Sequence, residues 1–82
     1  MTETLVKIKE VTKRLGVGRT TLYKNINQGL CTKPIKLTGH AVAWAASEIS
    51  VLVAGKIAGL DDDAMRLLVK KLHAKRAEAL VK

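Results

Sequence analysis

Two short apolar series separated by a Gly-Val-Gly segment restrict this chain to very few folds. The apolar positions are Ile8, Val11 and Leu15 in the first series and Leu22 and Ile26 in the second. Both series have the spacing of one face of a helix. Glycine commonly ends a helix because it enters the left-handed conformation without strain. The pattern therefore predicts a helix from near Leu5, a turn at 16–18 and a second helix that Gly29 ends, which together form a helix-turn-helix.

The outer side of the predicted second helix carries hydroxyls, amides and positive charge. Spacing the residues about 100° apart places Thr20, Lys24, Asn27 and Gln28 on the far side, with Tyr23 and Thr21 at its two edges. Between Val11 and Ile49 the only acidic residue is Glu48. An ordinary solvated helix face is the alternative interpretation, but such faces usually mix both charge signs. The pattern favours a surface for nucleic acid.

The overall charge agrees with this interpretation. Fifteen Lys and Arg against seven Asp and Glu give a net charge of +8 over 82 residues, as in many nucleic-acid-binding domains. Ribosomal proteins, membrane-surface peptides and partners of acidic proteins share this charge. Proteins that bind single strands stack bases on aromatic side chains, and only Tyr23 and Trp44 are aromatic here. Double-stranded DNA is therefore the preferred partner.

The segment after the second helix is predicted to form a β-hairpin. Pro34 disfavours helix, and the alternation of apolar and polar residues predicts two strands joined by the turn at 38–40. The residues expected to pack on the helices are Ile35, Leu37, Val42 and Trp44. A hairpin that follows a helix-turn-helix is a wing, whose tip offers polar side chains without a carboxylate.

Two further helices are predicted. The first begins near Ala46 and ends at Gly59, with a buried stripe of Ile49, Leu52, Val53, Lys56 and Ile57. The second runs from Asp62 to about Val81, and carboxylates at its start and cations towards its end suit the helix dipole. Its apolar sector holds Met65, Leu68, Val69, Leu72, Ala79 and Leu80, interrupted by Arg76. This last helix packs on the domain, pairs with another copy or lays its cations on DNA.

The sequence argues against catalysis, cofactors and metal sites. No Gly-rich phosphate loop or Ser/His/Asp arrangement is present, and His40 and His73 are too distant in sequence to suggest a metal site. Cys31 is the only cysteine and is expected to be a buried apolar residue. No apolar run is long enough to span a bilayer. We therefore expect a non-enzymatic, cytoplasmic, nucleoid-associated protein that binds no cofactor, metal or membrane.

The predicted order of helix, turn, helix, wing, Trp and helix is similar to that of one known protein family. The segments "EVTKRLGVGRTTLY", "NQGLCTKPIKL" and "AVAWAASEI", within residues 8–58, resemble the AlpA family of prophage regulators. These are small winged helix-turn-helix proteins related to phage excisionases and, more distantly, to MerR-type DNA-binding domains. Two departures are Gly18, where the family usually has Ser, and Cys31-Thr32 in place of Phe-Pro.

The resemblance implies a DNA-binding transcriptional regulator of a prophage or integrative element, acting for example on an integrase gene, or an excisionase that acts as a recombination directionality factor. The expected fold is mainly α with a small β-hairpin: a winged helix-turn-helix domain at 5–59 and a C-terminal helical extension at 60–82. An alternative function is a protein interaction module that docks on an acidic partner, such as a response regulator or integrase.

Candidate contact residues follow from these predictions. Those expected to contact DNA are Arg19, Thr20, Thr21, Tyr23, Lys24, Asn27, Lys33, Lys36, Thr38 and His40. Arg19 has an alternative role as a partner of Glu10. The residues expected to mediate oligomerisation are Met65, Leu68 and Leu72. The candidate partners besides DNA are integrase, RNA polymerase and a second copy of the chain, because one winged domain reads only a few base pairs.

Overall fold

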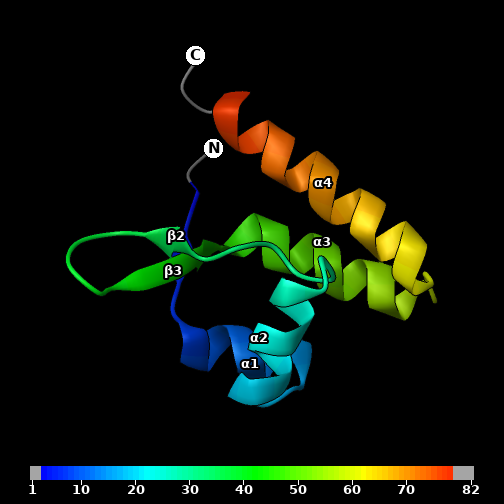
Figure 1. Ribbon diagram of the computed structural model, residues 1–82, viewed down its shortest axis with the longest axis horizontal. Coiled ribbons are helices and arrows are strands. Elements are labelled where there is room, and N and C mark those ends of the chain that lie inside the picture. Colours follow the sequence, from blue (N-terminus) through cyan, green and yellow to red (C-terminus); the bar gives the residue numbers. More distant parts are fainter. Residues whose placement is uncertain (1–2, 79–82) are drawn as a thin grey trace.

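The computed structural model describes residues 3–78, in which four helices pack beside a small three-stranded antiparallel sheet (Figure 1). The elements in chain order are β1 (Leu5–Val6), α1 (Ile8–Leu15), α2 (Arg19–Asn27), β2 (Ile35–Lys36), β3 (Val42–Ala45), α3 (Ala46–Ile57) and α4 (Asp62–Glu78). This order confirms the predicted fold class, a winged helix-turn-helix followed by a C-terminal helix. The end of that last predicted helix, from Ala79 to Val81, lies outside the described residues.

The turn between α1 and α2 forms as its glycine predicts. Gly16 adopts φ 70°, and its backbone N–H donates to the carbonyl of Thr12 at 2.9 Å. This left-handed residue ends α1 and redirects the chain. Val11 on α1 and Leu22 on α2 are both fully buried. The two helices therefore enclose apolar contacts and leave the outer side of α2 towards solvent.

The N-terminal strand β1 was not predicted. The expectation of a helix from near Leu5 is wrong, because Leu5 pairs with Ala45 and extends the sheet to the order β1-β3-β2. Ahead of it, the carboxylate of Glu3 accepts hydrogen bonds from the hydroxyl and backbone N–H of Ser47, and these bonds lower the pKa of Glu3. A strand of two residues is too short to show an alternating pattern. Its formation depends on a partner about forty residues along the chain.

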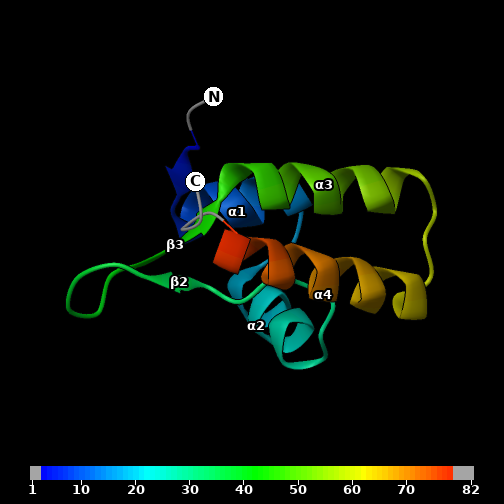
Figure 2. The same ribbon diagram turned by 90° about the horizontal axis from the view of Figure 1, so that it is seen from above.

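The predicted hairpin is present and projects away from the helices in both views (Figures 1 and 2). Its tip is closed by the N–H of Leu37, which donates to the carbonyl of Ala41 at 2.9 Å. Leu37 is 42% exposed, so the expectation that it packs on the helices is wrong. It lies beyond the strand pairs, where no described helix reaches. At the base of the hairpin, Trp44 is fully buried and its Nε1–H donates to the carbonyl of Thr32 at 3.1 Å.

Helix α3 buries a narrower stripe than the sequence predicts. Ile49 and Leu52 are buried as expected, but Lys56 is exposed and Ile57 is 82% exposed. The reason is the position of α4, which covers the side of α3 that carries Gly55. A Cβ atom on Gly55 would lie only 3.1 Å from the Sδ of Met65. Ile57 follows Gly55 by two residues and points about 200° away from it.

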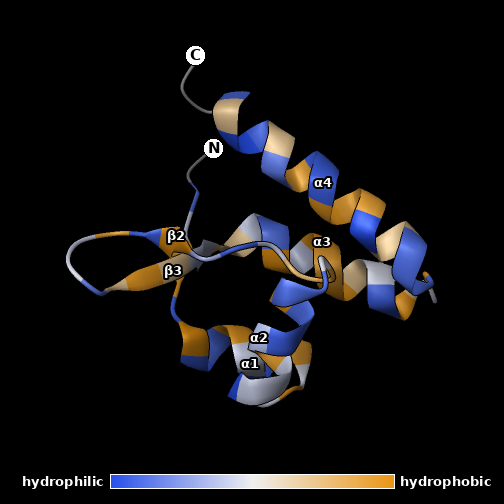
Figure 3. Cartoon of the chain, in the orientation of Figure 1, coloured by the Kyte–Doolittle hydropathy of each residue, from blue (hydrophilic) through white to orange (hydrophobic). Residues whose placement is uncertain are grey.

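Helix α4 packs into the same core as the other helices. The buried core residues are Val6, Val11, Leu22, Cys31, Trp44, Ile49, Leu52, Met65, Val69 and Leu72, with Leu68 packed against them. Met65 and Leu72 are 4% and 8% exposed. The expectation that Met65, Leu68 and Leu72 form an oligomerisation surface is therefore wrong, because these side chains pack against the protein's own core. Figure 3 shows hydrophobic and hydrophilic residues alternating along α4.

Burial also fits the prediction for Cys31, which is 2% exposed. Desolvation raises the pKa of its thiol to about 11. The thiolate is the reactive form of cysteine, so this side chain behaves as a small apolar residue near neutral pH.

Candidate nucleic-acid interface

The outer face of α2 is open to solvent along its whole length. The exposed residues on it are Arg19, Thr20, Thr21, Tyr23, Lys24 and Asn27, all of which were predicted to contact DNA. Tyr23 is 42% exposed, so its ring lies at the surface. Leu22 is fully buried and Ile26 packs against the core, and these two side chains hold the helix from behind.

The cations of this face are not used in ion pairs within residues 3–78. The alternative role for Arg19, pairing with Glu10, is wrong. Glu10 instead accepts from Arg14 at 2.8 Å, four residues along α1. Neither Arg19 nor Lys24 has a carboxylate partner among the described residues. Both side chains therefore remain available to an anionic ligand.

The hairpin carries a second group of predicted contacts. Lys36, Thr38 and His40 are exposed on it, and both ribbon views place its tip well to one side of α2 (Figures 1 and 2). Lys33, also exposed, lies in the loop that joins α2 to β2. The predicted contacts thus fall into two separated groups with Lys33 between them, rather than into one patch.

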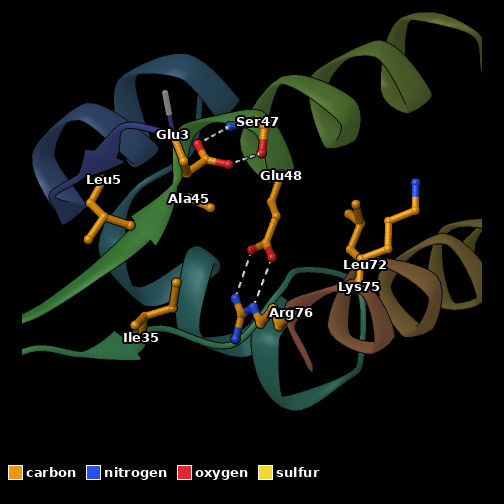
Figure 4. Close-up of a pocket in the computed structure, with 9 residues that line it drawn as sticks. All are labelled: Glu3, Leu5, Ile35, Ala45, Ser47, Glu48, Leu72, Lys75 and Arg76. Atoms are coloured by element: carbon orange, nitrogen blue, oxygen red, sulfur yellow. Dashed lines mark hydrogen bonds and ion pairs between the residues drawn. The ribbon is translucent and has the colours of Figure 1, made fainter. Parts of the chain in front are cut away.

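Helix α4 fixes the loop that contains Lys33. The backbone N–H of Lys33 donates to His73 Nε2 at 3.0 Å, and its carbonyl accepts from Arg76 Nη2 at 2.6 Å. Arg76 also makes a bidentate pair with Glu48 of α3, at 2.7 and 2.8 Å (Figure 4). The side chain of Glu48 is only 8% exposed and that of Arg76 is 27% exposed. Arg76 is therefore a structural cation that joins α4 to α3 and to the loop after α2.

A second arginine of α4 holds the end of α2. Arg66 Nε donates to the carbonyl of Gln28 at 2.8 Å, and its Nη1 lies 3.3 Å from Asp63. Carbonyls at the end of a helix lack an intrahelical donor and carry partial negative charge. Arg66 satisfies one of them, so α4 stabilises both the end of α2 and the loop that leads to the hairpin. Sequence analysis did not identify these roles of Arg66, His73 and Arg76.

The contact between His73 and Lys33 predicts a pH-dependent stability. His73 Nε2 accepts a hydrogen bond and so carries no proton. The pKa of His73 is lowered from 6.5, mainly because the side chain is partly buried and also because the positive charge of Arg76 is nearby. At pH values between the pKa of His73 in the folded protein and its ordinary pKa of 6.5, the unfolded chain therefore binds more protons than the folded protein. The free energy of unfolding is expected to decrease as the pH falls through that window, measured by urea denaturation from about pH 7.5 to 5.5.

The control for this experiment is His73→Gln, whose side-chain oxygen can accept the same hydrogen bond without titrating. The variant should lose part of the pH dependence over the same window. An identical pH dependence in both proteins would contradict the assignment, because carboxylates elsewhere would then explain the whole effect.

Two hollows lie beside α4. The larger, about 380 Å³, is mostly apolar and lies between β1, β2 and the end of α4, with Leu5, Ile35 and Leu72 among its lining residues (Figure 4). The smaller, about 290 Å³, lies between the end of α2, the following loop and α4. Within residues 3–78, no group of three or more His, Cys, Asp or Glu is arranged to hold a metal ion. No described helix is both long and apolar enough to cross a bilayer.

Comparison with known families identifies the relationship. A family model described as "Prophage CP4-57 regulatory protein (AlpA)" matches residues 4–56. The chain belongs to the AlpA family. The matched segment runs from the N-terminal strand to the last turn of α3, so the AlpA-family region contains α2 and the whole hairpin. Helix α4, with the three side chains that fix the loop and the end of α2, lies outside it.

A curated relative of this AlpA-family chain is "Uncharacterized protein ORF88" of Enterobacteria phage P4. It is 37% identical over 57 residues, which cover 70% of this chain and 65% of the phage protein. The match thus spans somewhat less than two thirds of the relative's length. No solved structure matches the chain.

Proposed function

We propose that this AlpA-family protein binds double-stranded DNA through α2 and the hairpin and regulates genes of a prophage or integrative element. The observation that carries the proposal is the outer face of α2, which is exposed, free of carboxylates and held rigidly by Leu22. Membership of a family of prophage regulatory proteins supports it.

The exposed side chains suit a helix seated in a major groove. Residues in the first turns of such a helix reach the base edges first, so Arg19 and Thr20 are the proposed base contacts. An arginine that pairs with a guanine edge contributes about 1 to 3 kcal/mol of discrimination. We assign Tyr23 and Lys24 to phosphates. Gly18, the residue before α2, provides no side-chain cap, and the first N–H groups of α2 can therefore also face a phosphate.

The hairpin extends the proposed interface. Lys36, Thr38 and His40 would follow the adjacent backbone or minor groove while α2 occupies the major groove. One winged domain reads only a few base pairs, so specificity in a genome requires a second copy nearby. Because Met65 and Leu72 are inside the core, adjacent copies must meet through a surface other than the stripe predicted from sequence.

Transcriptional regulation and excision both use this interface. An excisionase bends attachment-site DNA so that an integrase can act, and a regulator of an integrase gene binds its promoter. We propose regulation as the primary role because the matching family model describes a regulatory protein. The alternative is a module that docks on an acidic protein. The apolar stripe of α4 would be the natural docking surface for it, and the burial of that stripe in the core counts against this alternative.

The deciding experiment is selection of duplex fragments from a random library by the purified full chain, followed by mobility-shift titration of the enriched sequence. A single enriched sequence motif, with weaker binding to scrambled duplexes, is the expected result. A folded sample that binds no duplex in low-salt buffer would refute the proposal. Equal affinity for all duplexes would refute sequence-specific regulation and leave a nonspecific architectural protein.

The salt dependence of binding provides a quantitative prediction. If the protein neutralises about five phosphates, the logarithm of the association constant should fall with the logarithm of salt concentration at a slope of about −4.5. Affinity should then decrease about 500-fold between about 50 and 200 mM salt. Fluorescence anisotropy with the selected duplex measures this slope. A slope near zero would contradict a phosphate-contacting interface.

A further inference from the structure

The smaller hollow joins α4 to the proposed DNA-binding surface. It is about 290 Å³ in volume, and its polar lining comes from Asn27 of α2, Lys33 of the loop, and Arg66, Lys70 and His73 of α4. Asn27 and Lys33 are proposed DNA contacts, whereas Lys70 belongs to a helix outside the family-matching segment. The hollow therefore places a cation of α4 beside two residues of the proposed interface.

The charges around this hollow favour an anion. No carboxylate lines it, and within residues 3–78 neither Lys33 nor Lys70 forms an ion pair. Both lysines are exposed, so a ligand can reach them from solvent. His73 contributes no positive charge while its Nε2 accepts the N–H of Lys33. Arg66 also lines the hollow but is engaged by Gln28 and Asp63, so the two ammonium groups are the lining cations without a partner among the described residues.

The end of α2 would by itself oppose an anion here, because the last carbonyls of a helix carry partial negative charge. Arg66 removes much of this opposition. Its Nε donates to the carbonyl of Gln28 at 2.8 Å, and its side-chain carbons lie beside Gly29. The guanidinium therefore places positive charge directly at the end of the helix.

We propose that this hollow binds a phosphate group, held by Lys70 and Lys33 and approached by the Asn27 amide, and that the phosphate belongs to the backbone of the DNA that α2 contacts. The inference rests on the proposed function and extends it, because it gives α4 a direct part in DNA binding. A backbone contact of this kind fixes the position of α2 along the duplex without reading sequence.

The test compares Lys70→Gln with Lys71→Gln, which removes the same charge from the next residue of α4, an exposed lysine that does not line the hollow. Loss of one phosphate contact should make the salt slope of DNA binding shallower by about 0.9, equivalent to a fivefold to tenfold loss of affinity at about 0.1 M salt. Lys70→Gln should show this change with the selected duplex, and Lys71→Gln should change much less. Thermal unfolding of both variants checks that they remain folded.

Equal slopes for Lys70→Gln and Lys71→Gln, with tight binding by the unchanged protein, would refute the phosphate contact and leave the proposed function standing. Failure of the unchanged protein to bind any duplex would refute both. Inorganic phosphate distinguishes the source of the ligand: it should shift the Asn27 and Lys33 amide resonances only weakly, and the duplex should displace it. Tight binding of inorganic phosphate that persists with duplex bound would overturn the assignment to DNA.

Discussion

Replacing Tyr23 and Lys24 together by alanine is expected to lower DNA affinity by about 50-fold, with no change in fold. Both side chains are exposed on the outer face of α2, and Leu22, which anchors the helix, is untouched. Loss of the Lys24 ammonium removes one phosphate-neutralising contact, which contributes about eightfold to affinity at about 0.1 M salt. Loss of the Tyr23 hydroxyl removes a hydrogen bond that contributes about 1 kcal/mol, or about fivefold to sixfold. Anisotropy titration with the selected duplex measures the loss, and circular dichroism monitors the fold.

The matched control is Leu67→Ala with Lys71→Ala on α4. It likewise removes one positive charge and one large exposed side chain, since Leu67 is 56% exposed. The control should lower affinity much less than the α2 double variant. Equal losses would mean that overall positive charge, and not the face of α2, determines binding.

The second large effect is expected from Arg76→Met, which should lower the free energy of unfolding by about 3 kcal/mol. The change leaves the carboxylate of Glu48, 8% exposed, without its bidentate partner. It also removes the hydrogen bond from Arg76 to the carbonyl of Lys33. An uncompensated buried charge is costly because water no longer solvates it. Urea denaturation at neutral pH measures the effect.

Arg14→Met provides the comparison, because the pair of Arg14 and Glu10 is on the surface, with side chains 39% and 42% exposed. Exposed ion pairs contribute little to stability because water and salt screen them, so the free energy of unfolding of this variant should be close to that of the unchanged protein. Adding Glu48→Leu to Arg76→Met should recover much of the lost stability, because the buried carboxylate is then absent. Similar losses for Arg76→Met and Arg14→Met would contradict the structural role of the buried pair.

The local elements could be predicted because their signals are local. Helical spacing, Gly16 and Gly29 define the helix-turn-helix, and Pro34 followed by alternation predicts the hairpin. The exposed residues of α2 also follow from spacing alone. Whether they bind DNA stays a prediction, because exposure and charge describe a surface and not its ligand.

The failures concern contacts between distant parts of the chain. Strand β1 forms only because β3 is available to it, and no local pattern of two residues predicts that pairing. The apolar sector of α4 was recognised, but spacing cannot distinguish a helix that covers its own core from one that meets a second copy. Leu37 was misplaced because alternation does not show how far a hairpin projects.

Two charges in the sequence bear on how α4 packs. Glu48 lies four residues before Leu52, one turn along the same side of α3, and is buried in the structure, while Arg76 interrupts the apolar sector of α4. Two opposite charges, each within a stripe that must face the interior, satisfy one another best by pairing. A pair between these two charges indicates that α4 packs against α3, as the structure shows.

The buried pair of Glu48 and Arg76 also links the family-matching segment, residues 4–56, to the helix that follows it. A genetic exchange that replaced only the family-matching segment would bring in an α3 whose packing surface and charge need not match those of the resident α4. A carboxylate stranded in the protein interior, or a guanidinium facing a gap, would then unfold the hybrid. We therefore expect the family-matching segment and α4 to be inherited together, even though only the first matches the family model.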